Sequence, residues 1–208
     1  MQHDDTCCIV VTKPAGLLCV PGRGPDKQDC LSARVQRLHP DARIVHRLDM
    51  ATSGLVLMAR GDLMQRVLSQ AFERREVRKR YIAVVAGRLH PPAAADGWGE
   101  IDLPLAADWP RRPMQRIDLA MGRSSLTRWR VLSQGDGCTR LELEPVTGRT
   151  HQLRVHLHAI GHPILGDALY AEPAIRARAD RLLLHAWRLG FAHPMDGQPI
   201  SVESAPPF

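Results

Sequence analysis

The strongest constraint on the fold is the recurrence of short apolar segments separated by turns. Nine segments have the length and composition of strands: 8–12, 17–20, 54–59, 80–86, 101–105, 125–133, 139–146, 181–192 and 199–203. Three segments favour helices: 31–38, 62–75 and 150–160. Many strands interrupted by so few helices predict an α+β fold with a mixed, mostly antiparallel central sheet, rather than a doubly wound parallel sheet.

The length of 208 residues suits one α+β domain or two closely fused lobes. A loop at 88–99 that is rich in Pro, Ala and Gly is the candidate boundary between such lobes. No apolar run approaches the roughly 20 residues that span a bilayer, and the acidic, polar N-terminus is unlike a secretory signal. We therefore expect a cytoplasmic protein with no membrane segment, and a monomer.

The five cysteines are odd in number and include no C-x-x-C pair, so we expect reduced, mostly buried thiols. Net charge says more. The chain has 28 basic and 22 acidic side chains, a net charge of +6, and residues 43–88 alone carry ten basic and four acidic ones. Clustered positive charge suits a polyanion such as RNA, although a solvated surface or a preference for arginine codons would give the same count.

Motifs for several other chemistries are absent or incomplete. Glycines stand on either side of Arg23, but the third glycine and the following helix of a dinucleotide-binding fingerprint are missing. The sequence also contains no phosphate-binding Gly-Lys-Ser/Thr loop. Four histidines cluster between 151 and 162, but only His158 and His162 have the spacing of a helical ligand pair. We expect no metal and no small-molecule cofactor.

One segment, 46–54 (HRLDMATSG), places Arg47 two residues before Asp49 and leads into an apolar strand. In an extended segment the two side chains point to the same side, and an aspartate beside an arginine stays ionised. From the residues alone, a surface aspartate in a structural ion pair is the preferred interpretation.

This segment resembles the His-Arg-Leu-Asp-x-x-Thr-Ser-Gly signature of the RluA family of pseudouridine synthases. Further motifs that resemble those of the family follow in the family order: 79–81 (KRY), 145–156 (PVTGRTHQLRVH), 161–167 (GHPILGD) and 182–186 (LLLHA). The resemblance implies the pseudouridine synthase fold and the isomerisation of uridine to pseudouridine in RNA. That reaction needs no redox cofactor, ATP or metal.

Segments 21–23 and 108–113, together with Gln115, resemble the short members of the family rather than its larger relatives. The short members lack an N-terminal S4 RNA-binding domain and act on both a tRNA anticodon stem-loop and a 23S (large-subunit) rRNA loop. We therefore expect residues 1–208 to form a single catalytic domain without an S4 domain. Met114 is a departure, because a basic residue is expected there, and it puts fine substrate choice in question.

The resemblance implies three catalytic residues. Asp49 is the nucleophile or base at the sugar, and it could add to the uracil, attack C1′ or remove the C2′ proton. Arg149 pairs with Asp49, which would keep the carboxylate ionised and oriented. Tyr81 stacks on the uracil and is a candidate for taking the C5 proton, with a core aromatic as its alternative. Leu183 could form a wall of the uracil pocket, with an ordinary core leucine as its alternative.

A uridine in a stem-loop must be flipped out of its stack before it can react, and arginines that grip phosphates offset that cost. The candidate RNA-binding residues are His46, Arg47, Arg23, Lys79, Arg80, Arg111, Arg112, His151 and Arg154. Arg47 is the best candidate to reach the RNA or to replace the flipped base. His46 could do similar work or be a hydrogen-bonded structural histidine.

Two other functions compete with this interpretation. The first is a non-catalytic RNA-binding protein of the same fold, against which Asp49, Tyr81 and Arg149 argue together. The second is a glycosidase, which needs a second carboxylate at a set distance from Asp49. No acidic residue near Asp49 in the sequence is placed for that role.

Overall fold

The computed structural model describes residues 1–208, and the chain divides into two compact units. Unit 1 comprises residues 1–79 and 185–207, and unit 2 comprises residues 80–184 and Phe208. The loop at 88–99 lies inside unit 2. None of the helices combines the length and the hydropathy that crossing a membrane requires.

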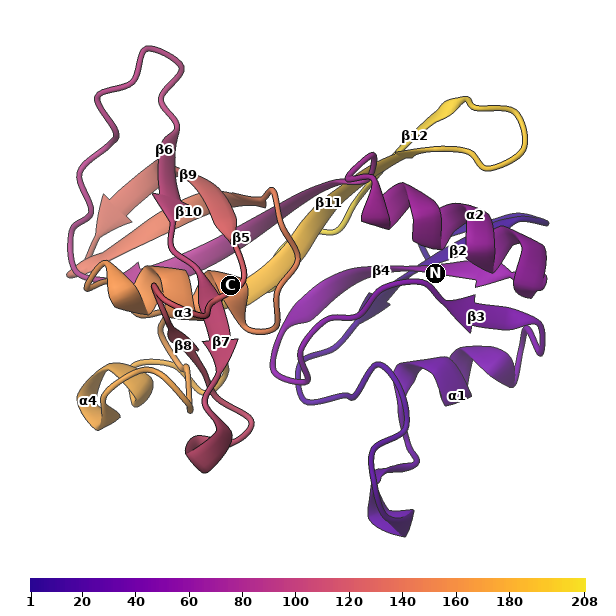
Figure 1. The fold of residues 1–208 in the computed structure, drawn as a ribbon, viewed down its shortest axis with the longest axis horizontal. Helices are drawn as coiled ribbons and strands as arrows, with labels where there is room; N and C mark the ends of the chain where they lie inside the picture. The colour runs from indigo at the N-terminus through magenta and orange to yellow at the C-terminus, as the bar shows by residue number, and fades with distance from the viewer. The chain divides into compact units, whose positions relative to one another are not determined.

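Unit 1 is built on a sheet whose neighbouring strands come from both ends of the chain (Figure 1). Its strands are β1 (His3–Asp4), β2 (Cys8–Lys13), β3 (Ala42–Ile44), β4 (Ser53–Arg60), β11 (Leu184–Ala192) and β12 (Pro199–Glu203). Its helices are α1 (Leu31–Gln36), α2 (Gly61–Glu73) and the short 3₁₀ helix η1 (Pro25–Lys27). The order is β1-β2-β4-β11-β12, with β3 also on β4, and only the β4–β11 pair is parallel.

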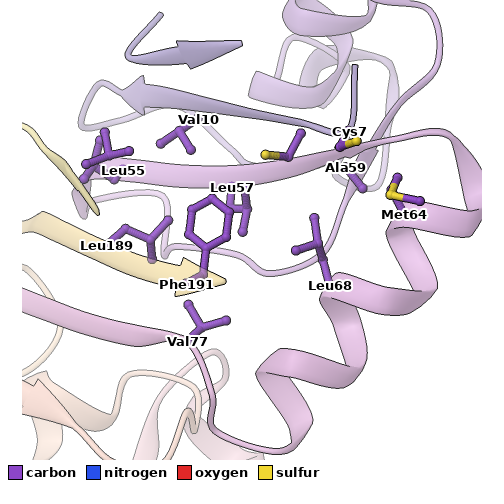
Figure 2. Close-up of a cluster of buried hydrophobic side chains, with 12 residues drawn as sticks. Cys7, Val10, Leu55, Leu57, Ala59, Met64, Leu68, Val77, Leu189 and Phe191 are labelled. Carbon is purple, nitrogen blue, oxygen red and sulfur yellow. The ribbon is translucent and has the colours of Figure 1, made fainter. Parts of the chain in front are cut away.

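β4 is buried on both faces, which explains why its sequence is a continuous apolar run rather than an alternating one. On one face, Leu55 and Leu57 pack in a cluster with Phe191 of β11 and Leu68 of α2 (Figure 2). Each of these side chains is at most 5% exposed. The helix α2 therefore covers the sheet with an apolar face. The spacing predicts that Leu63 and Val67 lie on this face, but both are exposed, and Met64 is buried beside Leu68 instead.

The close approach of β11 to β4 requires a glycine at position 54. Gly54 has a φ of +117°, and a Cβ there would lie 2.3 Å from the carbonyl oxygen of Ala186 on β11. Gly54 pairs with Ala186 across the parallel strands. The last residue of the 46–54 segment therefore has a structural explanation, because only glycine adopts this backbone conformation at low cost and leaves room for the neighbouring strand.

In unit 2 the neighbouring strands follow the order β5-β10-β9-β6, and every pair among them is antiparallel. Its strands are β5 (Arg78–Ala86), β6 (Gly99–Asp102), β9 (Leu126–Gly135) and β10 (Cys138–Pro145), and β7 (Leu105–Ala107) and β8 (Gln115–Ile117) form a separate hairpin. Its helices are η2 (Trp109–Arg111), α3 (Gln152–Ala159) and α4 (Pro173–Arg176), and α3 packs against β8, β9 and β10.

The expected α+β class with a mostly antiparallel sheet is confirmed. The strand expected at 101–105 is wrong in detail, since β6 ends at Asp102 and β7 begins at Leu105. Pro104 lies between them and has no N–H to continue a ladder. The extended segment expected at 17–20 is reduced to an isolated bridge at Leu18. The strands β3, β7 and β8 were not expected, because three residues are too few to show a periodicity.

A buried ion pair fixes α3 to the segment that follows it. Arg154 donates to both carboxylate oxygens of Asp167, at 2.8 and 2.7 Å, and the two side chains are 4% and 1% exposed. Asp167 also accepts the main-chain N–H groups of Leu169 and Tyr170. Burial alone raises the pKa of Asp167, but the hydrogen bonds and charge of Arg154 outweigh it and hold the pKa below its ordinary value.

We expect Gly54→Ala to lower the free energy of unfolding by about 2–4 kcal/mol, because the methyl group strains the backbone and separates β4 from β11. Urea denaturation followed by circular dichroism measures this change. Gly135→Ala is the control, since a Cβ there meets nothing within 4 Å. Equal stability of the two variants would contradict the proposed tight contact.

We expect Asp167→Asn to cost about 3 kcal/mol at neutral pH, because it leaves the Arg154 charge buried without a counterion. A carboxylate with a lowered pKa stabilises the fold above its unfolded pKa of 3.8 and loses that contribution as pH falls. The gap between wild type and variant in urea denaturation should therefore shrink below about pH 4. Asp96→Asn, which removes an exposed partner of Arg128, should cost little at any pH. A gap that does not change with pH would count against the ion pair.

Candidate active site

Asp49 lies in the connection between β3 and β4. The main-chain N–H of Thr52 donates to the carbonyl of Asp49 at 3.1 Å, which closes a turn just before β4 begins. Leu48 is buried, whereas Asp49 is half-buried and Arg47 is exposed. The leucine thus anchors the segment in the core and leaves its two charged neighbours at least partly accessible.

A buried lysine holds this turn from below. Lys13 is 0% exposed, and its ammonium donates to the carbonyls of Pro14, Leu17 and Met50 at 2.9, 2.8 and 3.0 Å. The carbonyl of Met50 also accepts the N–H of Gly16 at 2.8 Å. A buried charge is tolerated only when its donors are satisfied, so the three carbonyls and the ammonium constrain one another. The peptide immediately after the candidate catalytic aspartate is therefore held in place.

A thiol holds the residue on the other side of Asp49. The Cys19 thiol donates to the carbonyl of Leu48 at 3.3 Å, and the Leu48 N–H lies 3.2 Å from the same sulfur. Burial raises the pKa of Cys19, so the thiol keeps its proton at neutral pH. Sequence reasoning missed both Lys13 and Cys19. The only available signal was a lysine at the end of an apolar strand, directly before a Pro-Ala-Gly turn.

His46 makes internal contacts. Its Nε2 accepts the N–H of Leu57 at 2.9 Å, and its ring stacks on Phe72 with the centroids 4.4 Å apart. Burial, and then the nearby Lys79 ammonium, lower the pKa of His46 to about 3. The imidazole is therefore neutral, with its proton on Nδ1. These contacts agree with the structural alternative for His46.

A second histidine joins the end of the 46–54 segment to the closing LLLHA motif. His185 Nδ1 lies 2.8 Å from the hydroxyl of Ser53, and its Nε2 lies 3.0 Å from the carbonyl of Ser204. The carbonyl can only accept, so Nε2 carries the proton and Nδ1 accepts from Ser53. Ser53 is 3% exposed, which suits a structural hydroxyl.

Tyr81 lies on β5 opposite Leu143 of β10, and it is 9% exposed. Leu183 is half-buried next to the same strand. Its N–H donates to the carbonyl of Leu165 at 3.0 Å, and its carbonyl accepts the N–H of Val84 at 3.1 Å. Main-chain bonds thus hold Leu183 beside β5 within unit 2.

Arg80 is engaged inside unit 2. Its guanidinium lies 3.2 Å from Glu144 and 3.7 Å from Glu142, and it stacks 4.5 Å above the ring of Trp98. Arg130 donates to Glu142 at 2.7 Å and lies over the same ring. This stack of arginines, glutamates and one tryptophan balances the charge of Arg80 within the protein.

A buried amide shapes the loop that carries Arg149. Gln152 Oε1 accepts the hydroxyl of Thr147 at 2.7 Å and the N–H of Arg149 at 3.0 Å, while its Nε2 donates to the carbonyl of Leu126 at 2.9 Å. The Arg149 side chain donates to the carbonyl of Ser124 at 3.3 Å. Sequence reasoning gave Gln152 no role, although it lies inside the matched 145–156 motif.

His151 precedes α3 with a φ of +54°, and its Nδ1 lies 2.7 Å from the hydroxyl of Tyr170. Tyr170 also accepts the N–H of Gln115, so this hydroxyl ties α3 to β8. Arg154 is buried, and its guanidinium is occupied in the bidentate ion pair described above. This burial makes the Arg154 guanidinium unsuited to contact RNA phosphates, which was its predicted role.

The remaining candidate arginines, Arg23, Arg111 and Arg112, are exposed. Arg23 is exposed in the 21–29 loop of unit 1. Arg111 pairs with Asp108 at 2.6 Å but remains 69% exposed. Arg112 stacks 3.5 Å above the ring of Trp109, which is itself 67% exposed. Exposed guanidinium groups beside an exposed aromatic ring are suited to phosphates and unstacked bases.

The candidate residues are distributed over both units. Unit 1 carries Arg23, His46, Arg47, Asp49 and Lys79. Unit 2 carries Arg80, Tyr81, Arg111, Arg112, Arg149, His151, Arg154 and Leu183. The pairing of Asp49 with Arg149 stays a prediction.

Comparisons with known proteins agree with the motifs. Residues 8–159 match the family model described as RNA pseudouridylate synthase. The dual-specificity RNA pseudouridine synthase RluA of Yersinia pestis is 49% identical over 199 residues, which cover 95% of this chain and 94% of the relative. The protein of the same name from Escherichia coli K12 is 45% identical over 99% of this chain and 92% of its own length.

Solved structures show the same similarity. Human RNA pseudouridylate synthase domain containing 1 superposes with a TM-score of 0.80 at 29% identity, over 100% of this chain and 83% of the other. Human RNA pseudouridylate synthase domain containing 4 gives a TM-score of 0.77 at 25% identity, over 99% and 88%. Family model, relatives and solved structures thus agree over nearly the full chain, and this chain belongs to the RNA pseudouridylate synthase family of RNA-modifying isomerases.

Proposed function

We propose that this chain converts specific uridines to pseudouridine in a tRNA anticodon stem-loop, in a loop of 23S large-subunit rRNA, or in both. The relatives from Yersinia pestis and Escherichia coli, which match over nearly their whole lengths, are named dual-specificity enzymes. The observation that carries the proposal is Asp49 itself. It is a half-buried carboxylate in the matched motif, in a turn held by a buried ammonium and a buried thiol.

The proposed reaction breaks the N1–C1′ bond of uridine, turns the uracil and joins C5 to C1′. A proton leaves C5 and N1 gains one, so the product is an isomer and no co-reactant is consumed. We assign the step at the sugar or base to Asp49, the orientation of its carboxylate to Arg149, and stacking on the uracil to Tyr81. A rigid turn favours this chemistry, because a positioned carboxylate loses no orientational freedom when the substrate binds.

We propose that the RNA lies against Arg23, Arg47, Arg111 and Arg112, with Lys79 and His151 nearby and Leu183 at the uracil. The exposure of the four arginines supports this set, because phosphate contacts need accessible guanidinium groups. Flipping a uridine from a loop costs a few kcal/mol, and phosphate contacts of this kind offset the cost. We place Arg47 in the gap left by the flipped base, since it adjoins the catalytic turn.

We propose that residues 1–208 act as one catalytic domain, as a monomer, in the cytoplasm, where both kinds of RNA are found. The free, mostly buried cysteines support a reducing compartment.

We expect Asp49→Asn to reduce pseudouridine formation on a uridine stem-loop RNA by at least about a thousandfold, while RNA binding survives. Single-turnover assays and filter binding separate these two effects. Asp62→Asn, which removes an exposed carboxylate paired with Arg43, is the matched control and should retain wild-type turnover. Wild-type turnover in Asp49→Asn would remove Asp49 from the mechanism.

The same variants test the substrates in cells. In a strain that lacks the gene, pseudouridine should be missing from the anticodon stem-loop, the 23S loop or both, and the wild-type gene should restore it. Asp49→Asn should fail to restore it. An unchanged pseudouridine map in the deletion strain, together with tight RNA binding by the pure protein, would instead indicate a non-catalytic RNA-binding protein.

We expect RNA affinity to fall steeply with salt concentration, because binding releases counterions from phosphates. Arg47→Gln should reduce the slope of log K against log salt by about 0.7–0.9. Arg34→Gln is the control, since Arg34 forms an ion pair with Asp29 at 2.6 Å outside the 43–88 cluster. A slope that is flat in the wild type would exclude the cluster from the interface.

A further inference from the structure

A group of metal-ligating side chains surrounds Asp5, which lies between β1 and β2 in unit 1. None of these side chains belongs to the candidate catalytic or RNA-binding residues. Asp5 Oδ1 accepts the main-chain N–H groups of Cys7 and Cys8 at 2.7 and 2.8 Å. These two bonds fix the carboxylate, and its other oxygen, Oδ2, lies 2.7 Å from Nε2 of His3. One carboxylate oxygen is thus held in place and directed at a ring nitrogen.

A second histidine approaches the same oxygen from the other end of the chain. His193 begins the turn between β11 and β12, and its Nε2 lies 3.4 Å from Asp5 Oδ2. Its other nitrogen, Nδ1, lies 2.8 Å from Asp196 Oδ1. A carboxylate on the far nitrogen of an imidazole is the arrangement that orients histidine ligands in metal sites, because it fixes the ring and raises the basicity of the coordinating nitrogen.

A thiol completes the group. Cys8 is 0% exposed, and its Sγ lies 3.9 Å from Asp5 Oδ2. The ligand atoms of His3, Asp5 and Cys8 all lie within 4.8 Å of one another, as do those of Asp5, Cys7 and His193. The side chains of His3, Asp5 and His193 are 28%, 28% and 17% exposed, so solvent reaches the group.

We propose that His3, Asp5, Cys8 and His193 form a binding site for one Zn²⁺ ion that fastens the N-terminal hairpin to the β11–β12 turn. Zinc bonds of about 2.0–2.3 Å in a tetrahedron separate neighbouring ligand atoms by about 3.3–3.8 Å. The 3.4 and 3.9 Å separations at Asp5 Oδ2 are close to this range, and the 2.7 Å hydrogen bond to His3 must open by about 0.6 Å. His193 groups with Asp5 and Cys7 rather than with His3 and Cys8, so its ring must move toward His3 and Cys8 for all four ligands to bind one ion. Nitrogen, oxygen and sulfur ligands together favour zinc over magnesium or calcium.

The charges near the site are compatible with a cation. Arg60 lies close to the site and donates to the main-chain carbonyl of Asp5 at 3.3 Å. Its charge is matched by Asp41 at 2.9 Å and by Asp4 at 3.5 Å. Zinc binding would replace the thiol proton of Cys8, which leaves to solvent, and would join the first strand of unit 1 to its last hairpin.

Zinc titration of the untagged, full-length protein tests the site. The protein is stripped with a chelator, desalted and titrated with Zn²⁺ against a chromophoric competitor. We expect one equivalent to bind and to raise the melting temperature of the chain, because a ligand that binds only the folded state stabilises it. Co²⁺ in place of Zn²⁺ should give tetrahedral visible bands and a thiolate charge-transfer band.

Variants identify the ligands. His3→Ala or His193→Ala should weaken zinc binding at least about 100-fold, and Asp196→Asn should weaken it about 10–100-fold through the orientation of His193. Cys8→Ser should remove the cobalt charge-transfer band. The matched controls are His90→Ala, an exposed histidine, and Cys138→Ser, a cysteine of unit 2, and both should bind zinc like the wild type.

Three results would overturn the site: no zinc bound by the wild type, unchanged binding in His3→Ala or His193→Ala, or no charge-transfer band in the wild type. If the wild type binds no zinc, the group is a set of hydrogen bonds from two histidines to one aspartate. None of these readouts involves RNA. They therefore test the zinc site independently of the proposed enzymatic function.

Discussion

The sheet of unit 1 depends on the approach of β11 to β4 at Gly54, where no side chain fits between the two backbones. This contact lets a strand near the C-terminus pair with one from the first third of the chain. The buried bond from Ser53 to His185 then locks the register. Because β4 also pairs with β2 and β3, most of the unit is built outward from this strand. The turn with Asp49 leads directly into it, so the position of the carboxylate follows from the packing of the core.

The turn around Asp49 is held by groups that are costly to bury. The Lys13 ammonium loses its hydrogen bonds to water on burial and replaces them with hydrogen bonds to three carbonyls, one of which belongs to Met50. The buried Cys19 thiol likewise contacts the carbonyl and the N–H of Leu48. These arrangements make sense where the position of a neighbouring side chain matters more than stability. In the proposed mechanism, the geometry of the single carboxylate of Asp49 is such a case.

The excess positive charge of residues 43–88 is less available than its count indicates. Arg43 pairs with Asp62, Arg60 with Asp41, and Arg80 with Glu144. In each pair, an acidic side chain of the protein neutralises the basic one. In the proposed interface, the attraction for RNA therefore comes from fewer, exposed arginines, among them Arg47. Their accessibility, rather than the net charge, identifies the surface that phosphates can reach.

The sequence by itself determined the fold class and the family, since the apolar segments and the motif at 46–54 are local patterns that need no partner to be recognised. It also singled out Asp49, because a contiguous motif preserves the identity of its residues. Only the tertiary structure decided what surrounds them. The burial of Lys13, the burial of Arg154 in an ion pair and the approach of His193 to Asp5 all depend on residues that lie apart in the sequence. The physical reason is that burial and hydrogen bonding are properties of neighbours in space, which sequence spacing does not record.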